Sequence, residues 1–265
     1  MIESGVEAFR TERSSDVRIR PLPLAAASGA ALLAAGLLPA GASGTPRPTP
    51  AQARGQVQAQ AQTQAQTQAH EGTVGATELL AEVTSCDPIS HGRYRTDAGA
   101  RATVPVCGKK GAVFWKADMD IDCDGQRTVR CNEDTDPWFQ GDTAFRQSDG
   151  EPLKSDTLPY IVVPSPSRKW NYRAAGIKGG GVAAVIHRDQ VQYAVVGDTG
   201  PRKIIGEASY ATARALGIDP DPAHGGTRSG VTYILFTNSR ASPIESHSAA
   251  VALGERLAEQ FLQDN

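Results

Sequence analysis

The chain has 265 residues, with 29 acidic and 27 basic side chains and a formal net charge of −2 at pH 7. This length allows one or two domains. The near balance of charge excludes the strongly basic field by which many proteins attract nucleic acid or anionic membranes. Aromatic residues make up only 6% of the chain, but aliphatic residues are plentiful, so a core can form over part of it.

The N-terminal residues have the pattern of a secretory signal peptide. A stretch without charges, residues 22–44, ends in Ala40-Gly41-Ala42, a small-residue cleavage pattern. It is preceded by Arg10, Arg13, Arg18 and Arg20. A transmembrane anchor is the alternative, but the prolines and glycines of the stretch make it a weak spanning helix. We therefore predict a signal peptide over residues 1–42 and a secreted, extracellular protein.

A low-complexity segment follows. Between Gly44 and Ala69, Gln-Ala and Gln-Thr units repeat with few charges and no large apolar side chains. Such a segment cannot bury enough apolar surface to offset the entropy lost on ordering. We predict a disordered Pro/Gln/Ala-rich linker over residues 43–76 and a folded domain over residues 77–265.

All four cysteines lie in the predicted domain. In an exported protein the default expectation is disulfide pairing. Zinc is the alternative, but the sequence has no CxxC pair and no HExxH motif. Of the three possible pairings we favour the short local loop Cys123–Cys131, which leaves Cys86–Cys107.

Short β-branched runs bounded by Gly, Pro, Asp or Asn predict strands. They cover residues 112–115, 128–130, 160–163, 182–187, 191–196 and 231–236. Few helical patterns separate these runs, which argues against alternating βαβ units. The pattern favours one mainly β domain, formed as a β-sheet or a closed barrel with packed helices.

Two helices are predicted. The first covers Glu207–Leu216 and ends at Gly217. The second begins at Ser242-Pro243-Ile244-Glu245, where Ser and Glu have the spacing of a capping box and Pro takes the first helical position. Its apolar face is formed by Val251, Leu257, Ala258, Phe261 and Leu262.

The most acidic segment runs from Asp118 to Asp124, with Asp at every second position. In an extended strand these four carboxylates would share one face and call for a compensating cation. The alternatives are a solvated acidic edge, a groove for a cationic ligand, and a calcium site. The calcium hypothesis rests on Asp120-x-Asp122-x-Asp124-Gly125, the first half of an EF-hand loop, although Cys131 stands where that loop has Glu.

Two further acids frame the segment GDTGPRKIIGEAS, residues 197–209. Asp198 lies in a turn, where Asp is common. Glu207 begins the first predicted helix, where the macrodipole favours a carboxylate. The spacing alone leaves open whether they are a catalytic pair or ordinary turn and helix-start residues. Signatures of other chemistries, GxSxG, GxxxxGK[ST] and GxGxxG, are absent.

Five segments together resemble the family-75 glycoside hydrolases, the chitosanases of fungi and actinomycetes. They are KADMDIDCDG (116–125), TDPWFQGDTAF (135–145), LPYIVVP (158–164), YAVVGDTGPRKIIGEASYATARALGI (193–218) and GVTYILF (230–236). The resemblance implies endo-cleavage of β-1,4 links in chitosan with inversion. It places the general base on Asp198 of GDTG and the general acid on Glu207 of GEAS. It also implies a six-stranded barrel of the double-psi kind.

These roles lead to physical expectations. A general acid must hold its proton, whereas a helix N-terminus lowers the pKa of a carboxyl, so Glu207 would have to be buried. Inversion predicts carboxyl groups ~6.5–9.5 Å apart. Chitosan carries ammonium groups, which carboxylates bind through charge-assisted hydrogen bonds. We therefore predict substrate subsites that draw on Asp118, Asp120, Asp122, Asp142 and Trp138.

The resulting prediction is a secreted chitosanase with its catalytic domain over residues 77–265. We expect it to act as a monomer on chitosan, without metal or cofactor, and to bind neither nucleic acid nor, after signal cleavage, membrane. Two alternatives stay open. One is a non-catalytic secreted module that binds polysaccharide or calcium, and the other is an endoglucanase-like hydrolase that acts on neutral glucan.

Overall fold

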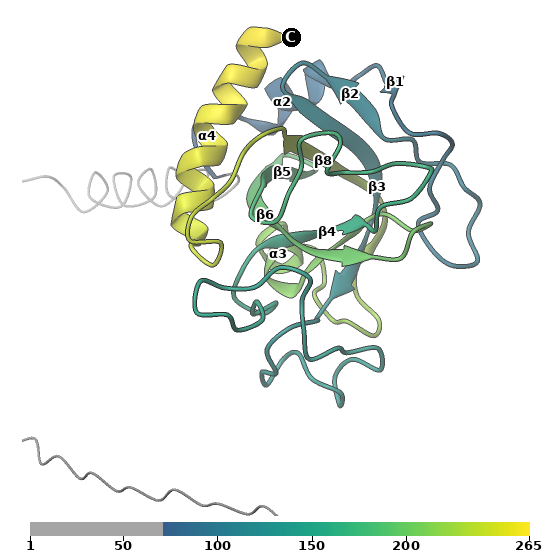
Figure 1. Cartoon of the computed structure of the whole chain (residues 1–265), viewed down its shortest axis with the longest axis vertical. Coiled ribbons are helices and arrows are strands. Elements are labelled where there is room, and N and C mark those ends of the chain that lie inside the picture. Colours follow the sequence, from purple (N-terminus) through teal and green to yellow (C-terminus); the bar gives the residue numbers. More distant parts are fainter. Residues whose placement is uncertain (1–70) are drawn as a thin grey trace, which may run out of the picture. The chain divides into compact units, whose positions relative to one another are not determined.

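A computed structural model describes residues 71–265, so the predicted signal peptide and all but the last residues of the predicted linker lie outside it. The described part contains eleven elements (Figure 1). In chain order they are α2 (Ala76–Glu82), β1 (Asp87–Pro88), β2 (Cys107–Lys109), β3 (Ala112–Asp122), β4 (Tyr160–Pro164), β5 (Val182–His187), β6 (Gln190–Gly200), β7 (Glu207–Ser209), α3 (Tyr210–Ala215), β8 (Thr227–Phe236) and α4 (His247–Asp264).

Six of the strands close into a mixed barrel. Its order is β3-β7-β4-β6-β5-β8, and β8 pairs back onto β3. The pairs β3–β7 and β4–β6 are parallel, and the other four are antiparallel. Closure leaves these strands without a free edge. The predicted mainly β, six-stranded barrel is confirmed.

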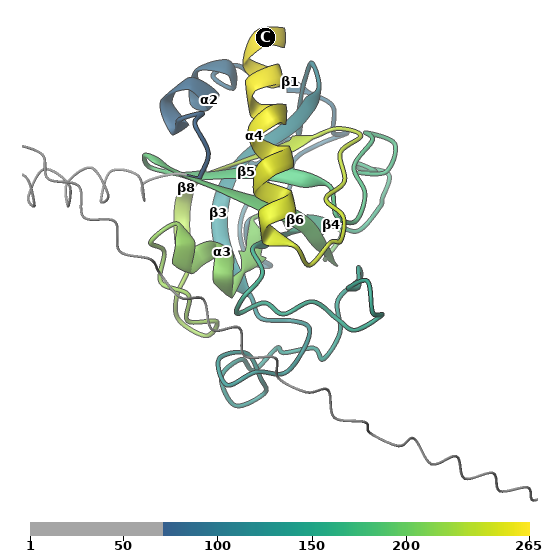
Figure 2. The ribbon, with the colours of Figure 1, turned by 90° about the vertical axis from the view of Figure 1, so that its left-hand side faces the viewer.

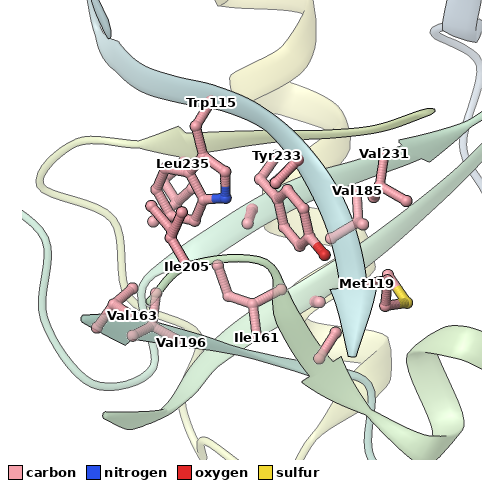
Figure 3. Close-up of a cluster of buried hydrophobic side chains, with 14 of the residues drawn as sticks. Trp115, Met119, Ile161, Val163, Val185, Val196, Ile205, Val231, Tyr233 and Leu235 are labelled. Carbon is pink, nitrogen blue, oxygen red and sulfur yellow. The ribbon is translucent and has the colours of Figure 1, made fainter. Parts of the chain in front are cut away.

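The barrel interior is filled by side chains that alternate along the strands (Figure 3). Trp115 of β3 is fully buried there and stacks on Tyr233 of β8, with ring centroids 5.4 Å apart. Its neighbour Phe114 points the other way, into the layer outside the barrel. Trp115 is therefore a core residue.

The outer layer is covered by α4, which runs along the outside of the barrel beside β5 and β6 (Figure 2). Phe261 of α4 packs edge-on against Phe236 of β8, at 6.2 Å between ring centroids. Because apolar side chains cover both its faces, β5 is buried over its whole length. No helix within residues 71–265 is long and apolar enough to cross a membrane.

Two disulfides join segments next to the sheet. Cys86–Cys107 ties the segment after α2 to β2, and Cys123–Cys131 closes a loop directly after β3; both have Cα atoms 5.1 Å apart. These are the two bridges that the spacing favoured, and the pairing is confirmed.

The predicted strand at Thr128–Arg130 is wrong. These residues lie in turns of the loop closed by Cys123–Cys131. The hydroxyl of Thr128 accepts hydrogen bonds from the backbone N–H groups of Arg130 and Cys131, at 3.2 and 3.1 Å. A side chain that bonds its own backbone in this way competes with strand pairing, and the β-branched Val129 is left 92% exposed.

Both predicted helices begin later than expected, and α2 was not predicted. Residues 207–209 form β7, and α3 begins at Tyr210 because Ser209 caps it, accepting from the N–H of Thr212. The expected capping box at Ser242–Glu245 lies in a loop, and α4 begins at His247 after the cap Ser246. In each case a serine closer to the apolar run provides the N-cap.

Candidate active site

A cleft of about 770 Å³ lies where the ends of β3 and β6 meet β7. Among residues 71–265, no Lys, Arg or His lines it. Its lining includes seven carboxylates, those of Asp97, Asp120, Asp122, Asp124, Asp136, Asp198 and Glu207. The cleft therefore has a strongly negative lining in a chain whose overall charge is nearly balanced.

Asp198 reaches the cleft through an irregularity in β6. The parallel register with β4 shifts so that Ile161 faces Val196 and Val162 faces Asp198, which leaves Gly197 as the extra residue. A Cβ at Gly197 would lie 2.6 Å from Tyr160, so only glycine fits. Bulges of this kind re-aim the side chains beside them, and here the bulge places Asp198 in the cleft.

Asp198 is 7% exposed, and its carboxyl group is firmly held. Its Oδ1 accepts hydrogen bonds from the backbone N–H groups of Ala144, at 2.8 Å, and Thr199, at 2.6 Å. Burial raises the pKa of this carboxyl, while the two N–H donors oppose the rise. Donors to a carboxylate favour its ionised form, so the two N–H groups orient Asp198 and limit the rise in its pKa.

Glu207 enters the same cleft from β7. This short strand runs parallel to the end of β3, with Glu207 opposite Asp120, and the N–H of Asp120 donates to the carbonyl of Gly206 at 2.8 Å. The Oε2 of Glu207 lies 2.5 Å from where a Cβ on Gly200 would be. Since Gly200 is two residues beyond Asp198, the two acids of the GDTG…GEAS segment are neighbours in space.

The expectation that a helix N-terminus lowers the pKa of Glu207 is wrong, because Glu207 belongs to a strand and not to the first turn of α3. Burial raises its pKa to about 7, and the charges of Asp120, Asp124 and Asp198 add to the rise. Glu207 thus holds a proton in weakly acidic solution, while Asp198 next to it is supplied with donors for its ionised form. Two neighbouring carboxyls with such different hydrogen-bond surroundings are candidates for acid and base roles.

Three of the predicted substrate residues line the cleft. Asp120 and Asp122 come from the end of β3, and Trp138 comes from the loop after the Cys123–Cys131 bridge, with 84% of its surface exposed. The Oδ1 of Asp122 accepts from the N–H of Asp124 at 2.7 Å and from the hydroxyl of Tyr160 at 3.2 Å.

The other two predicted residues do not line this cleft. Asp142 is exposed and its Oδ2 accepts a hydrogen bond from Arg146 Nη2 at 2.6 Å. Asp118 is buried and lines a neighbouring hollow instead. The register of β3 against β8 shifts between Ala117 and Met119, so the simple alternation expected for the aspartates is interrupted at Asp118.

Sequence reasoning missed three lining carboxylates, Asp97, Asp124 and Asp136. Asp124 and Asp136 lie within segments already singled out, so the acidic pattern itself was a signal for them. Asp97 had none. Its loop reaches the cleft because Arg95 pairs with the segment before β7, donating to the carbonyl of Lys203 and accepting from the N–H of Ile205, both at 3.0 Å.

The EF-hand alternative is wrong, because residues 120–122 are paired with β7 as a strand. Within the described residues, one set of three carboxylates has oxygens close enough together to surround a single ion. Asp122, Asp124 and Asp198 have oxygens that all lie within 4.8 Å of one another. Part of this oxygen set is already engaged, since Oδ1 of Asp198 accepts two backbone N–H groups.

Comparison with known proteins identifies a family and several relatives of this chain. The family model for the fungal chitosanases of glycosyl hydrolase group 75 matches residues 119–263, a range that contains both Asp198 and Glu207. An endo-chitosanase of Aspergillus fumigatus is 30% identical over 169 residues, 58% of this chain and 71% of the relative.

Two proteins of Aspergillus oryzae are similarly related. Endo-chitosanase B of strain ATCC 42149 / RIB 40 is 32% identical over 157 residues, which are 53% of this chain and 65% of the relative. Endo-chitosanase C is 33% identical over 177 residues, 63% of this chain and 44% of the relative. The chain thus spans from less than half to about seven tenths of the length of these three relatives.

Proposed function

This chain belongs to the chitosanases of glycosyl hydrolase group 75, and on that premise we propose that it cleaves the β-1,4 links of chitosan with inversion. Glu207 acts as the general acid and Asp198 as the general base. The observation that carries the proposal is the cleft, which the described part of the chain lines with seven carboxylates and no basic side chain. It holds an acid with a pKa near neutrality beside a carboxylate bonded to two backbone N–H groups.

Glu207 is suited to protonate the leaving group. Its pKa of about 7 leaves the carboxyl protonated in weakly acidic solution, where the amines of chitosan are also charged. In the proposed step Glu207 gives this proton to the glycosidic oxygen as the bond from that oxygen to the anomeric carbon breaks. The carboxyl then remains as a carboxylate among Asp120, Asp124 and Asp198, so taking up a new proton from solvent is favourable.

Asp198 is suited to activate water. Two backbone donors fix Oδ1, which leaves Oδ2 for a water molecule. In the proposed step this water attacks the anomeric carbon from the face opposite the leaving oxygen, and its proton passes to Asp198. An inverting pair needs room for that water between the two carboxyls. The proton on Asp198 is released to solvent after the product leaves.

Substrate binding would use the remaining acids of the cleft. Asp120 and Asp122 offer oxygens to the ammonium groups of glucosamine units through charge-assisted hydrogen bonds. The exposed indole of Trp138 supplies a flat apolar surface beside them, of the kind on which the apolar face of a sugar ring packs. Asp142 is paired with Arg146 and has no direct part in the proposal.

We also propose that the protein is exported and acts outside the cell as a monomer. Residues 1–42 would be the signal peptide and residues 43–76 a linker, with the catalytic domain from residue 77 onward. Support comes from the signal-like sequence and from two disulfides in the described part, since disulfides persist in oxidising compartments.

The proposal is tested by incubating the purified protein with chitosan and measuring new reducing ends, with proton NMR to identify the first anomer released. We expect α-anomeric products, because inversion of a β link gives the α configuration. A β-anomeric product would contradict inversion. Activity that survives in both Glu207→Gln and Asp198→Asn, each checked for folding by circular dichroism, would contradict the assignment of the pair.

The two alternatives give different results in the same assay. A binding module would retain chitosan without releasing reducing ends. A hydrolase of neutral glucan would cleave a soluble cellulose derivative at least as fast as chitosan. We expect instead that the acidic lining makes chitosan the preferred substrate and that this preference weakens at high salt.

A further inference from the structure

The carboxyl group of Asp198 depends on a donor that lies far away in the sequence. Of its two backbone donors, Thr199 is the next residue of β6 and is placed together with it. Ala144 is 54 residues earlier, in the loop between β3 and β4, and its N–H still reaches Oδ1 at 2.8 Å. No ion pair within residues 71–265 joins Asp198 to a cation. The loop must therefore hold Ala144 in place if this donor is to orient Asp198.

Thr143, directly before Ala144, is bonded on both sides of its hydroxyl. It is 5% exposed, and its Oγ1 donates to the carbonyl of Phe145 at 2.7 Å and accepts from the N–H of Leu153 at 3.0 Å. The first bond closes a short turn around Ala144, and the second ties this turn to the segment that returns toward β4. A side chain that bonds the nearby backbone in this way fixes the local conformation. The hydroxyl of Thr143 thereby sets the direction of the Ala144 N–H.

The two partners of this hydroxyl are themselves anchored on the barrel. Leu153 is fully buried, and its Cδ1 would lie 2.8 Å from a Cβ on Gly197, the bulge residue before Asp198. Phe145 packs on Gly179, where a Cβ would lie 2.3 Å from the ring, and contacts the core inside the barrel. The turn is therefore attached beside the same bulge that aims Asp198 into the cleft.

Arg146 braces the same loop from the solvent side. Its Nη2 donates to Oδ2 of Asp142 at 2.6 Å, and its Nη1 donates to the carbonyl of Gly150 at 2.8 Å. The other oxygen of Asp142, Oδ1, accepts the N–H of Thr143 at 2.7 Å. A planar guanidinium can bridge two such acceptors, which the ammonium of a lysine on its flexible stem does less well. Asp142, expected from the sequence to bind substrate, thus belongs to the support of this loop.

We propose that Thr143 and Arg146 are positioning residues that lock the N–H of Ala144 onto Oδ1 of Asp198 and so aim the base of the reaction. The inference rests on the proposed function, because both residues act through the proposed base. None of residues 142–146 lines the cleft, so these side chains influence the reaction without touching the substrate. With Oδ1 fixed by two donors, the direction of Oδ2 toward the attacking water is fixed as well. Misplacement of a reacting group lowers the rate of the chemical step.

Kinetics on chitosan test the role of Thr143. Thr143→Val keeps the shape of the side chain and removes the hydroxyl, so we expect kcat to fall about tenfold while KM changes by less than about twofold. Thr143→Ser keeps the hydroxyl and should retain most of kcat. Thr212→Val is the matched control, because it removes another buried hydroxyl, which donates to the carbonyl of Tyr160 at 3.0 Å. This control should leave kcat unchanged.

Two kinetic results would overturn the inference. One is a Thr143→Val variant whose kcat equals that of Thr212→Val. The other is a Thr143→Ser variant no more active than Thr143→Val, because that result would assign the effect to the packing of the methyl group and not to the hydroxyl.

Hydrogen exchange measures the lock itself, without turnover. In the unaltered chain the Ala144 amide should exchange slowly although the residue is exposed, because its hydrogen is bonded to a carboxylate. Thr143→Val should speed this exchange about tenfold, the loss typical of one weakened hydrogen bond. The amide of Val195, which donates to the carbonyl of Pro159 at 3.1 Å, is the internal reference and should not change. Equal rates for Ala144 in the two proteins would contradict the lock.

Arg146 keeps the inference testable if Thr143→Val does not fold. The position is exposed, and Arg146→Lys keeps the charge, so the substitution changes the bridge alone. We expect exchange at Ala144 to rise about threefold, the size typical of an exposed ion pair, and kcat to fall by a similar factor. An unchanged exchange rate at Ala144 would overturn the inference.

The inference and the proposed function fail in different ways. If the unaltered chain releases no reducing ends, or if activity survives in Asp198→Asn, the catalytic proposal fails. Exchange at Ala144 then still decides whether Thr143 and Arg146 position Asp198. If Asp198→Asn abolishes activity while Thr143→Val matches Thr212→Val in kcat and in exchange at Ala144, the proposed function stands and the inference is overturned.

Discussion

The two halves of β3 contribute to the molecule in opposite ways. In residues 112–117, Phe114 packs in the apolar layer outside the barrel and Trp115 fills the barrel, and only Lys116 is exposed. In residues 118–122, aspartates alternate with Met119 and Ile121, and burial raises the pKa of every one of these aspartates. One half removes apolar surface from water, whereas the other gathers like charges in a place that disfavours charge.

The comparison shows how one strand can carry both a core and a charged site. Burial of large apolar side chains is the main favourable contribution to folding, and the first half supplies it on both faces. The second half is destabilising at neutral pH, because each buried carboxylate loses hydration and repels its neighbours. An unfavourable contribution of this kind must be offset elsewhere in the fold, and the buried apolar half of the same strand contributes to that offset.

We expect the largest effect from changing Glu207, which lies opposite Asp120 in the charged half of β3. Glu207→Gln removes the proton donor, so we expect kcat on chitosan to fall about 10²–10⁴-fold while the thermal midpoint stays the same or rises. Glu259→Gln on the exposed face of α4 is the matched control. Equal kcat values for the two variants would show that Glu207 is not the acid.

The apolar half is tested by Trp115→Ala. Removing this fully buried side chain from its stack on Tyr233 should lower the free energy of unfolding by about 3–5 kcal/mol. Urea denaturation measures the change. Val129→Ala, at a side chain 92% exposed, should change it by less than about 0.5 kcal/mol. A loss at Trp115 no larger than at Val129 would contradict the division of β3 into two halves.

The pH dependence of activity tests the coupling between β3 and β7. Glu207 has a pKa of about 7, so kcat/KM should fall about tenfold for each pH unit above that value as the acid loses its proton. Among the neighbouring charges that raise the pKa of Glu207, that of Asp120 contributes most. Asp120→Asn should therefore move the basic limb to lower pH, and Asp189→Asn, at an exposed acid in the turn between β5 and β6, should leave it in place. A basic limb that Asp120→Asn does not move would show that the two strands are not coupled in this way.

We expect the smallest effect from removing one negative charge from the cleft. The pKa of Asp124 rises from 3.8 to about 7 on folding, mainly through burial. Between these values the folded chain binds more protons than the unfolded chain, so stability falls as pH rises. Asp124→Asn keeps an oxygen for the N–H of Gln140 but loses this dependence. It should gain about 1–2 kcal/mol over the unaltered chain at about pH 8 and almost nothing at about pH 4. An equal gain at both pH values would point to packing instead.

Much of the fold could be predicted from local patterns. The β-branched runs at Tyr160–Val163 and Val182–His187 were placed to within a residue, since apolar runs bounded by turn residues need no distant information. Errors came where side chains bond the nearby backbone. Thr128 turns a β-branched run into a loop, and Ser209 delays a helix, so Glu207 becomes a strand residue.

The candidate site was recoverable only where a motif carried it. Asp198 and Glu207 stand in a distinctive segment, and Asp120 and Asp122 in a dense acidic run. Asp97 carries no such mark, because its position depends on a bridge between Arg95 and Ile204 over a separation of more than 100 residues. Asp118 was singled out for its charge, but its burial, with Oδ1 unpaired within the described residues, follows from a strand irregularity that no periodicity reveals.

By itself, the sequence indicated the mainly β class and the favoured disulfide pairing, because both rest on residue type and short-range spacing. It singled out the two acids of the GDTG…GEAS segment only through the resemblance of that segment to a known family. Only the tertiary structure decided how the pKa values of those acids shift. The rise in the pKa of Glu207 comes from burial and from Asp120, Asp124 and Asp198, which lie on other strands and loops. Electrostatic environment depends on distance in space and on exclusion of water, and both arise only when the barrel closes.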